Sequence, residues 1–374
     1  MADEPTAGEV ALARSVTLEV DVSDAAGLGV DVHATVTCVY PERGELGDRP
    51  VVAVALPGAG YSRNYFTFDM PGSATGGQAG WHVRRGWIFV AVDTLGVGEA
   101  SLPDPADLDL TRLAAVNHAV TRAMLERLAA GSVSADLAPI GNPVVLGLGQ
   151  SMGGGLTIVQ QAHHDTFDAI AILGFSAVWT STRKLPGSLP AGVPYLSRDT
   201  ALPRPDPRSH DQRCAIAANP LLLRLQGNAD LYPNKSETPP GWHFHFDDVP
   251  ADVRELDLTA TGTAPPWRSE TIPGAVFHML APGSLGPEAA AIVVPVLSAF
   301  GERDVSEDPR LEHKAFRHAV DFSSFICPRM GHMHNFASSR EILWSRIHHW
   351  GGHVADLKGR LSEDWPARLF SDSY

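Results

Sequence analysis

The chain has 374 residues, of which 44% are hydrophobic and 19% are charged, so it can bury a large core and lacks the composition of a disordered protein. Its formal net charge of -14, with no cluster of Lys and Arg, argues against nucleic acid or another polyanion as the main partner. Three cysteines, Cys38, Cys214 and Cys327, are too few and too scattered for a disulfide framework or a Cys-rich zinc site. We expect them to be buried thiols.

The first residues of the chain do not resemble a secretory signal. Met1–Pro5 is acidic, and neither a basic start nor an apolar run follows it. Even the apolar stretch Ala289–Ala299 is shorter than the roughly 20 residues that a membrane-spanning helix needs. We therefore expect a cytoplasmic protein without a membrane span.

Two kinds of strand are predicted along the chain. Arg14–Val22 and Val30–Tyr40 alternate apolar and polar residues around a turn that contains glycine, which predicts an antiparallel hairpin with one wet face. Later runs are apolar without alternation, which is typical of strands buried on both faces of a parallel sheet. These runs are Val51–Leu56, Trp87–Val92, Val144–Leu148, Ala169–Leu173 and Ile292–Ala299.

Helices are predicted between these strands. Leu108–Ala129 is the clearest, because its apolar residues recur along one helix face. Alternation of strand and helix favours a mostly parallel, doubly wound α/β sheet with helices on both sides. In such a sheet the functional groups gather at the carboxyl ends of the strands.

The pattern fails between about Trp179 and Pro273, where Pro, Gly, Trp and polar residues dominate. A structureless loop of that length is uncommon inside a compact domain, so we interpret it as an inserted lid packed over the site. The predicted organisation is a core over residues 1–177, a lid over 178–274, and the second part of the core over 275–374.

A serine stands at a sharp turn between a predicted strand and a predicted helix. The strand Val144–Leu148 leads into Gly149-Gln150-Ser151-Met152-Gly153, and the helix continues to His163. Glycine on both sides of the serine allows the backbone to pass closely, while the serine oxygen is held above the sheet edge. The helix start directs backbone N–H groups at any negative charge that develops there.

A dinucleotide-binding turn is the alternative interpretation of this segment, since Gly147, Gly149 and Gly153 resemble a variant of the glycine fingerprint. That fingerprint needs an acidic residue at the carboxyl end of the next strand. Asp168 instead precedes the next predicted strand, Ala169–Leu173, so the acid is at the wrong end.

Four further segments surround the serine turn in a characteristic order. Leu56-Pro57-Gly58-Ala59-Gly60-Tyr61-Ser62-Arg63 follows an apolar strand, and Val92–Ser101 is similar to an Asp-x-x-Gly-x-Gly-x-Ser turn. Pro295–Asp304 is an apolar strand that runs into a loop, and Asp321–His332 is a last strand that ends in Gly-His before a helix at Glu341–Trp350. In these segments the chain resembles the α/β-hydrolase superfamily over nearly its whole length, the insertion excepted.

The resemblance implies a catalytic triad of Ser151, Asp304 and His332, in the chain order that this family uses. A histidine must take the serine proton and return it to the leaving group, and a carboxylate must orient and stabilise the imidazole. Two alternatives stay open. Glu302 competes with Asp304 for the role of the acid, and His334 competes with His332 for the role of the base.

The resemblance also implies an oxyanion hole made by the backbone N–H groups of Ala59 and Met152. Many family members have His-Gly where this chain has Pro57-Gly58. This departure leaves Gly60 as the alternative to Ala59.

A metal site is a rival constellation in the insertion. His243-Phe244-His245-Phe246-Asp247-Asp248 places two imidazoles two residues apart beside carboxylates, which can chelate zinc and activate water. A metallohydrolase signature, however, requires a histidine at the position of Asp248.

The sequence therefore predicts a serine hydrolase that needs no cofactor or metal and cleaves a small carboxylic ester, lactone or thioester through an acyl-enzyme on Ser151. Three alternatives remain: an acyltransferase that uses the same triad, a metal-dependent hydrolase that uses His243 and His245, and a binding protein that kept only the fold.

Overall fold

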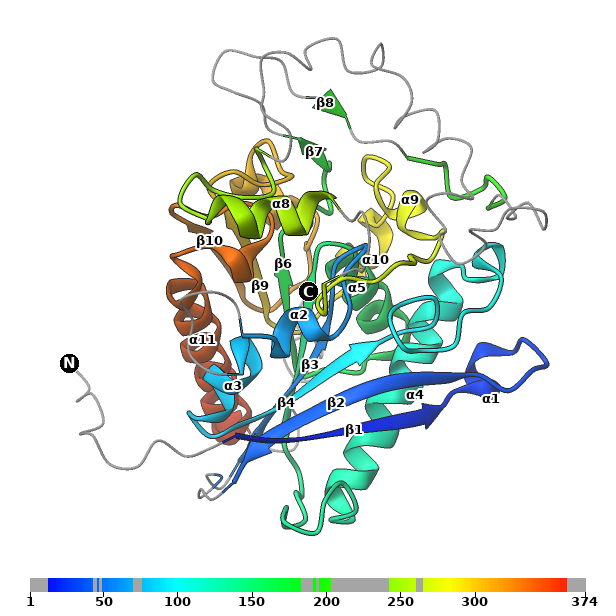
Figure 1. Cartoon of the computed structure of the whole chain (residues 1–374), viewed down its shortest axis with the longest axis vertical. Helices are drawn as coiled ribbons and strands as arrows, with labels where there is room; N and C mark the ends of the chain where they lie inside the picture. The colour runs from blue at the N-terminus through cyan, green and yellow to red at the C-terminus, as the bar shows by residue number, and fades with distance from the viewer. Residues whose placement is uncertain are drawn as a thin grey trace, which may run out of the picture.

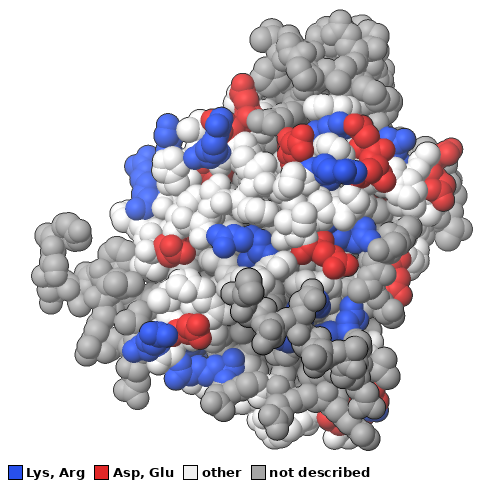
Figure 2. All heavy atoms as spheres, turned by 90° about the vertical axis from the view of Figure 1, so that its left-hand side faces the viewer, with Lys and Arg blue, Asp and Glu red and all other residues white. Residues whose placement is uncertain are grey.

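The computed structural model of the chain describes residues 13–42, 46, 49–69, 76–182, 191–192, 195–202, 242–259 and 265–361. Among these residues, no helix combines the length and the apolar composition that crossing a membrane requires. On the face shown in Figure 2, acidic and basic side chains are interspersed rather than gathered by sign.

An eight-stranded sheet forms the centre of the molecule, in the order β1-β2-β4-β3-β5-β6-β9-β10 (Figure 1). The pairs β1/β2 and β2/β4 are antiparallel, and the pairs from β4 to β10 are parallel. The strands are β1 (Ala13–Asp21), β2 (His33–Pro41), β3 (Val51–Leu56), β4 (Trp87–Asp93), β5 (Val144–Gln150), β6 (Ala169–Leu173), β9 (Val296–Gly301) and β10 (Phe322–Cys327).

Helices cover both faces of this sheet (Figure 1). On one face α4 (Leu110–Ala129) packs against α5 (Met152–His164), which also contacts α10 (Gly286–Ala291). On the other face α3 (Gly77–Val83) contacts α11 (Arg340–Leu361). The shorter helices are α1 (Ser23–Ala26), α2 (Asn64–Thr67), η1 (Pro105–Asp107), η3 (Pro309–Lys314) and η4 (His334–Phe336).

Two apolar cores result, one on each side of the sheet. Strand β3 shows why its sequence has no alternation, because Val52, Val54 and Leu56 enter one core while Val51, Ala53 and Ala55 enter the other. The predicted parallel strands, the N-terminal antiparallel pair and the strand-helix alternation are thereby confirmed.

Several boundaries differ from the prediction. Strand β9 begins at Val296 rather than at Ile292, because α10 ends at Ala291 and Pro295, which has no N–H to donate, separates the two elements. Helix α4 begins at Leu110 rather than at Leu108, since the side chain of Asp109 caps it by accepting from the N–H of Arg112 at 2.8 Å.

The structure gives the positions of two of the three cysteines and of Asp168, the residue that bears on the dinucleotide-binding alternative. Cys38 and Cys327 are buried free thiols as expected, and Cys214 lies outside the described residues. Asp168 precedes β6 and forms an ion pair with Lys358 at 2.7 Å. It therefore lies at the opposite end of that strand from the one a dinucleotide site requires.

Part of the predicted insertion, between β6 and β9, is described. It contains β7 (Ser181–Thr182), β8 (Ala191–Gly192), α8 (Ala251–Thr259) and α9 (Val276–Met279). Helix α8 lies beyond the ends of β6 and β9, where the chain leaves the sheet (Figure 1). The sequence did not predict α8, because it is short and only Val253 and Asp257 face inward and are buried.

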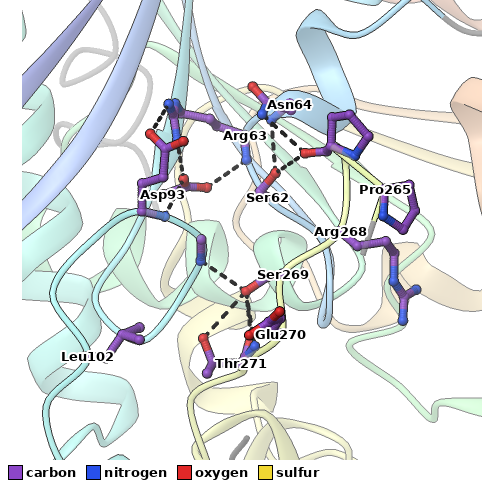
Figure 3. A pocket seen from close by; sticks show the side chains of 13 residues that line it. Ser62, Arg63, Asn64, Asp93, Leu102, Pro265, Arg268, Ser269, Glu270 and Thr271 are labelled. Atoms are coloured by element: carbon purple, nitrogen blue, oxygen red, sulfur yellow. Dashed lines mark hydrogen bonds and ion pairs between the residues drawn. The ribbon is translucent and has the colours of Figure 1, made fainter. Parts of the chain in front are cut away.

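A cavity of about 300 Å³ lies between the core and the insertion (Figure 3). Two hydrogen bonds beside it join these parts: Oγ of Ser62 donates to the carbonyl of Pro266 at 3.1 Å, and the N–H of Gly98 donates to Oγ of Ser269 at 2.9 Å. On the core side of this cavity Arg63 forms a cluster of hydrogen bonds: it is 4% exposed and donates to Thr37, Asp93 and Glu99. The Val92–Ser101 turn thus supplies two acceptors, Asp93 and Glu99, to this cluster. In Figure 3 the guanidinium of Arg268, on the opposite wall, points away from this cluster.

Candidate active site

Ser151 stands between the last residue of β5 and the first residue of α5. Its backbone has φ 51° and ψ -117°, a conformation that non-glycine residues rarely adopt. The flanking glycines make this turn possible. A Cβ atom at Gly153 would lie 2.0 Å from the carbonyl oxygen of Leu56, and one at Gly149 would lie 2.3 Å from that of Gly153.

Three residues that are far apart in the sequence form one chain of hydrogen bonds at this turn. Nε2 of His332 lies 2.9 Å from Oγ of Ser151, and Nδ1 of His332 lies 2.6 Å from Oδ1 of Asp304. His332 and Asp304 are 4% and 1% exposed. The structure thus brings together Ser151, His332 and Asp304, in the arrangement that proton transfer from the serine requires.

Asp304 accepts four hydrogen bonds, two on each carboxylate oxygen. Oδ1 also accepts from the N–H of Val305 at 2.7 Å, and Oδ2 accepts from the N–H of Gly301 at 2.7 Å and from Nε2 of His334 at 2.8 Å. Burial alone would raise the pKa of Asp304. The charge of His332 and the hydrogen bonds from both imidazoles outweigh burial, so that the pKa of this carboxyl lies well below its usual range.

The two histidines that compete for the role of the base have different partners. Nε2 of His334 is bonded to Asp304 and not to Ser151, and within the described part of the chain its buried Nδ1 has no partner. His334 therefore lies on the far side of Asp304, while His332 lies between Asp304 and Ser151. The alternative acid, Glu302, is exposed and accepts from the N–H of Arg329 at 2.9 Å.

The segment that follows β3 passes close to the serine. A Cβ atom at Gly58 would lie 3.2 Å from Cβ of Ser151, so the backbone that precedes Ala59 is a near neighbour of the turn. Within the described residues, the N–H groups of Ala59 and Met152 have no acceptor. Gly60 has φ 77°, and its carbonyl accepts from the N–H of Ser269 at 2.9 Å.

Backbone contacts to the insertion hold the loop that carries His332. The N–H of His332 donates to the carbonyl of His243 at 2.7 Å, and the side chain of Gln150 donates to the carbonyl of His332 at 3.0 Å. Sequence reasoning did not find these partners. Gln150 is adjacent to the serine in the motif, but the role of His243 depends on its carbonyl, which carries no sequence signal.

The histidine pair of the metal alternative does not converge. Nε2 of His245 is bonded to Asp257 at 2.8 Å, whereas the ring of His243 packs against that of Phe244. Burial and the neighbouring His332 lower the pKa of His243 to about 4. In the part of the chain that the structure describes, no group of three His, Cys, Asp or Glu side chains is arranged to hold a metal ion.

Neither a family model nor a curated protein matches the sequence. Among solved structures, a proline iminopeptidase from Mycobacterium smegmatis matches with a TM-score of 0.54 and 17% identity, over 91% of this chain and 98% of that one. The α/β hydrolase GrgF from Penicillium sp. sh18 gives 0.53 and 14%, over 91% and 99%. A thermophilic esterase from Thermogutta terrifontis gives 0.52 and 13%, over 90% and 99%. At such low identities the likeness concerns the fold, and we conclude that this chain has the α/β-hydrolase fold.

Proposed function

We propose that this protein is a serine hydrolase that cleaves a small carboxylic ester through an acyl-enzyme on Ser151. The observation that carries the proposal is the chain of hydrogen bonds from Ser151 through His332 to the buried Asp304. An esterase among the structures of similar fold supports the choice of an ester. Lactones and thioesters react by the same addition to a carbonyl and belong to the same proposal.

The first half of the reaction forms the acyl-enzyme. Nε2 of His332 accepts the proton of Ser151 as Oγ attacks the carbonyl carbon of the ester. Asp304 accepts from Nδ1–H and stabilises the imidazolium that results. The N–H groups of Ala59 and Met152 hold the negative charge on the carbonyl oxygen, and His332 then returns the proton to the leaving alcohol.

The second half releases the acid. Water takes the place of the alcohol, His332 accepts a proton from it, and the hydroxide adds to the acyl carbon. When the tetrahedral intermediate collapses, Oγ of Ser151 recovers the proton from His332. Every proton passes through one imidazole, which needs a partner that stays ionised, and the low pKa of Asp304 provides one.

In this proposal His334 is a positioning residue rather than the base. Its Nε2 donates to Oδ2 of Asp304, the oxygen that His332 does not use. This hydrogen bond fixes the rotation of the carboxylate, so that Oδ1 faces the catalytic imidazole.

The test is a set of purified variants assayed on short-chain p-nitrophenyl esters. We expect hydrolysis by the parent, loss of at least about 10³-fold in kcat in both Ser151→Ala and His332→Ala, and a much smaller loss in His334→Ala. Turnover should be unchanged by a chelator. Full activity of Ser151→Ala would overturn the proposal, and chelator-sensitive hydrolysis would transfer the chemistry to a metal site.

A further inference from the structure

A second buried aspartate, Asp257 on α8, collects hydrogen bonds from three separate segments. Oδ2 accepts from the hydroxyl of Tyr61 at 2.6 Å and from Nε2 of His245 at 2.8 Å, and Oδ1 accepts from Nε1 of Trp267 at 2.9 Å. Asp257 is 0% exposed. Because a buried carboxylate is costly unless its lone pairs are satisfied, this set of three donors is a specific arrangement.

One arm of this cluster leads to the segment after β3. Tyr61 ends the Gly58–Tyr61 turn, in which its N–H donates to the carbonyl of Gly58 at 3.1 Å. Trp267, the partner of the same carboxylate, accepts from the N–H of Ser62 at 2.9 Å through its carbonyl. Both the side chain of Tyr61 and the backbone beside it are therefore tied to Asp257 and its neighbour.

The other arm leads to the loop of the base. His245 ends the segment whose two preceding carbonyls, those of His243 and Phe244, accept from the N–H groups of His332 and Met333 at 2.7 and 2.8 Å. The two backbones touch, since a Cβ atom at Gly331 would lie 2.5 Å from the carbonyl oxygen of Phe244. The ring of Phe244 also packs edge-on against the ring of His332, with centroids 5.6 Å apart.

We propose that Asp257 is a positioning residue that holds the oxyanion segment and the base loop in register with Ser151. The proposal rests on the proposed function, because it assigns these two segments to the same reaction. It also means that residues 242–259 and 265–269 act as a fixed clamp on the site rather than as a lid that must open. Asp257 touches neither Ser151 nor His332, so its effect on the reaction passes through backbone position.

The physical reason lies in geometry. An oxyanion donor and a general base work only when each lies within a few tenths of an ångström of its place, and a shift of about 1 Å can lower the rate on the order of 100-fold. Asp257 is the point that both segments share. Its removal leaves three buried donors without an acceptor, and the two segments are no longer held by hydrogen bonds to one shared carboxylate.

The main test replaces Asp257 by Asn, with Asp252→Asn as the matched control. Asp252 lies in the first turn of the same helix and is exposed. We expect Asp257→Asn to lower kcat about 10- to 100-fold with KM within about twofold, and Asp252→Asn to leave both unchanged. Tyr61→Phe and His245→Phe remove one donor each and should give about two- to tenfold losses, so they test the proposal if Asp257→Asn does not fold.

Amide hydrogen exchange supplies a readout that does not depend on activity. Peptides that contain Ser62 and peptides that contain His332 and Met333 should exchange faster in Asp257→Asn than in the parent. In Tyr61→Phe only the first peptide should change, and in His245→Phe only the second.

These outcomes separate the inference from the proposed function. If the parent does not hydrolyse esters but amide exchange changes in both segments, the positioning role of Asp257 is supported and the proposed ester hydrolysis is wrong. If the parent hydrolyses esters while folded Asp257→Asn keeps full kcat, or its added exchange is confined to α8, Asp257 is structural and the inference fails.

Discussion

Two buried carboxyl groups follow β9, only eight positions apart, and they differ in what surrounds them. Asp304 and Glu312 are each 1% exposed. Asp304 accepts from the imidazoles of His332 and His334, whereas Glu312, on η3, accepts from the hydroxyl of Ser176 at 2.6 Å and the N–H of Ala177 at 3.0 Å. Burial raises the pKa of Glu312 to about 7, while the pKa of Asp304 lies well below its usual range.

The difference shows that burial alone does not decide the charge of a carboxyl group. At Glu312 neutral donors only reduce the rise in pKa that burial causes. At Asp304 a partner that can become cationic turns this rise into a decrease. In the proposed reaction the carboxylate of Asp304 therefore lies where an imidazolium must form, whereas the donors at Glu312 are a neutral hydroxyl and a backbone N–H group.

Replacing Asp304 by Asn should remove the carboxylate that accepts from His332 and with it most of the turnover. The amide keeps the shape but cannot stabilise the imidazolium, and its N–H₂ group can force His332 into the wrong tautomer. We expect kcat to fall by about 10³- to 10⁴-fold while the protein stays folded. Ester hydrolysis at saturating substrate measures this, and a loss below about tenfold would show that Asp304 is not the acid of the triad.

Replacing His334 should lower turnover less, because Asp304 keeps its hydrogen bond to His332. His334→Leu takes one donor from Asp304, so that the carboxylate holds the proton on the neighbouring imidazole more tightly. We expect about tenfold lower kcat/KM and an acidic limb of the pH profile that moves to higher pH. His334→Gln, whose amide can donate to the same oxygen, should restore both. An unchanged profile in His334→Leu would contradict the positioning role.

Replacing Glu312 by Gln should change stability rather than turnover. The pKa of Glu312 rises from 4.5 to about 7 on folding, so between these values the folded state binds more protons than the unfolded state. The unfolding free energy of the parent, relative to the variant, should therefore decrease as pH rises through this window, by up to about 3 kcal/mol. Denaturant titrations at about pH 5 and about pH 8 measure it, and equal differences at both would refute the assignment.

The sequence was sufficient for the parts of the molecule that depend on local pattern. Runs without alternation, such as Val51–Leu56, predicted strands that are buried on both faces, and Gly149 and Gly153 indicated a turn with no room for side chains. The order of the strands placed Ser151, Asp304 and His332 at one sheet edge, and the hydrogen bonds join them there.

Other parts of the site depend on contacts that no local pattern records. His332 and His334 are two residues apart in one loop, and each bonds to one oxygen of Asp304. Only the path of the backbone between them decides which ring reaches Ser151. Asp257 was missed because its partner Tyr61 is 196 positions away and because α8 is a single short helix.

Covalent labelling shows whether Ser151 is the nucleophile. The parent, Ser151→Ala and His332→Ala should be treated with a fluorophosphonate probe, and the modified peptide should be located by mass spectrometry. We predict one adduct on the parent, located at Ser151, no adduct on Ser151→Ala, and strongly slowed labelling of His332→Ala. Labelling of another residue, or a parent that does not react, would contradict the assignment of Ser151 as the nucleophile.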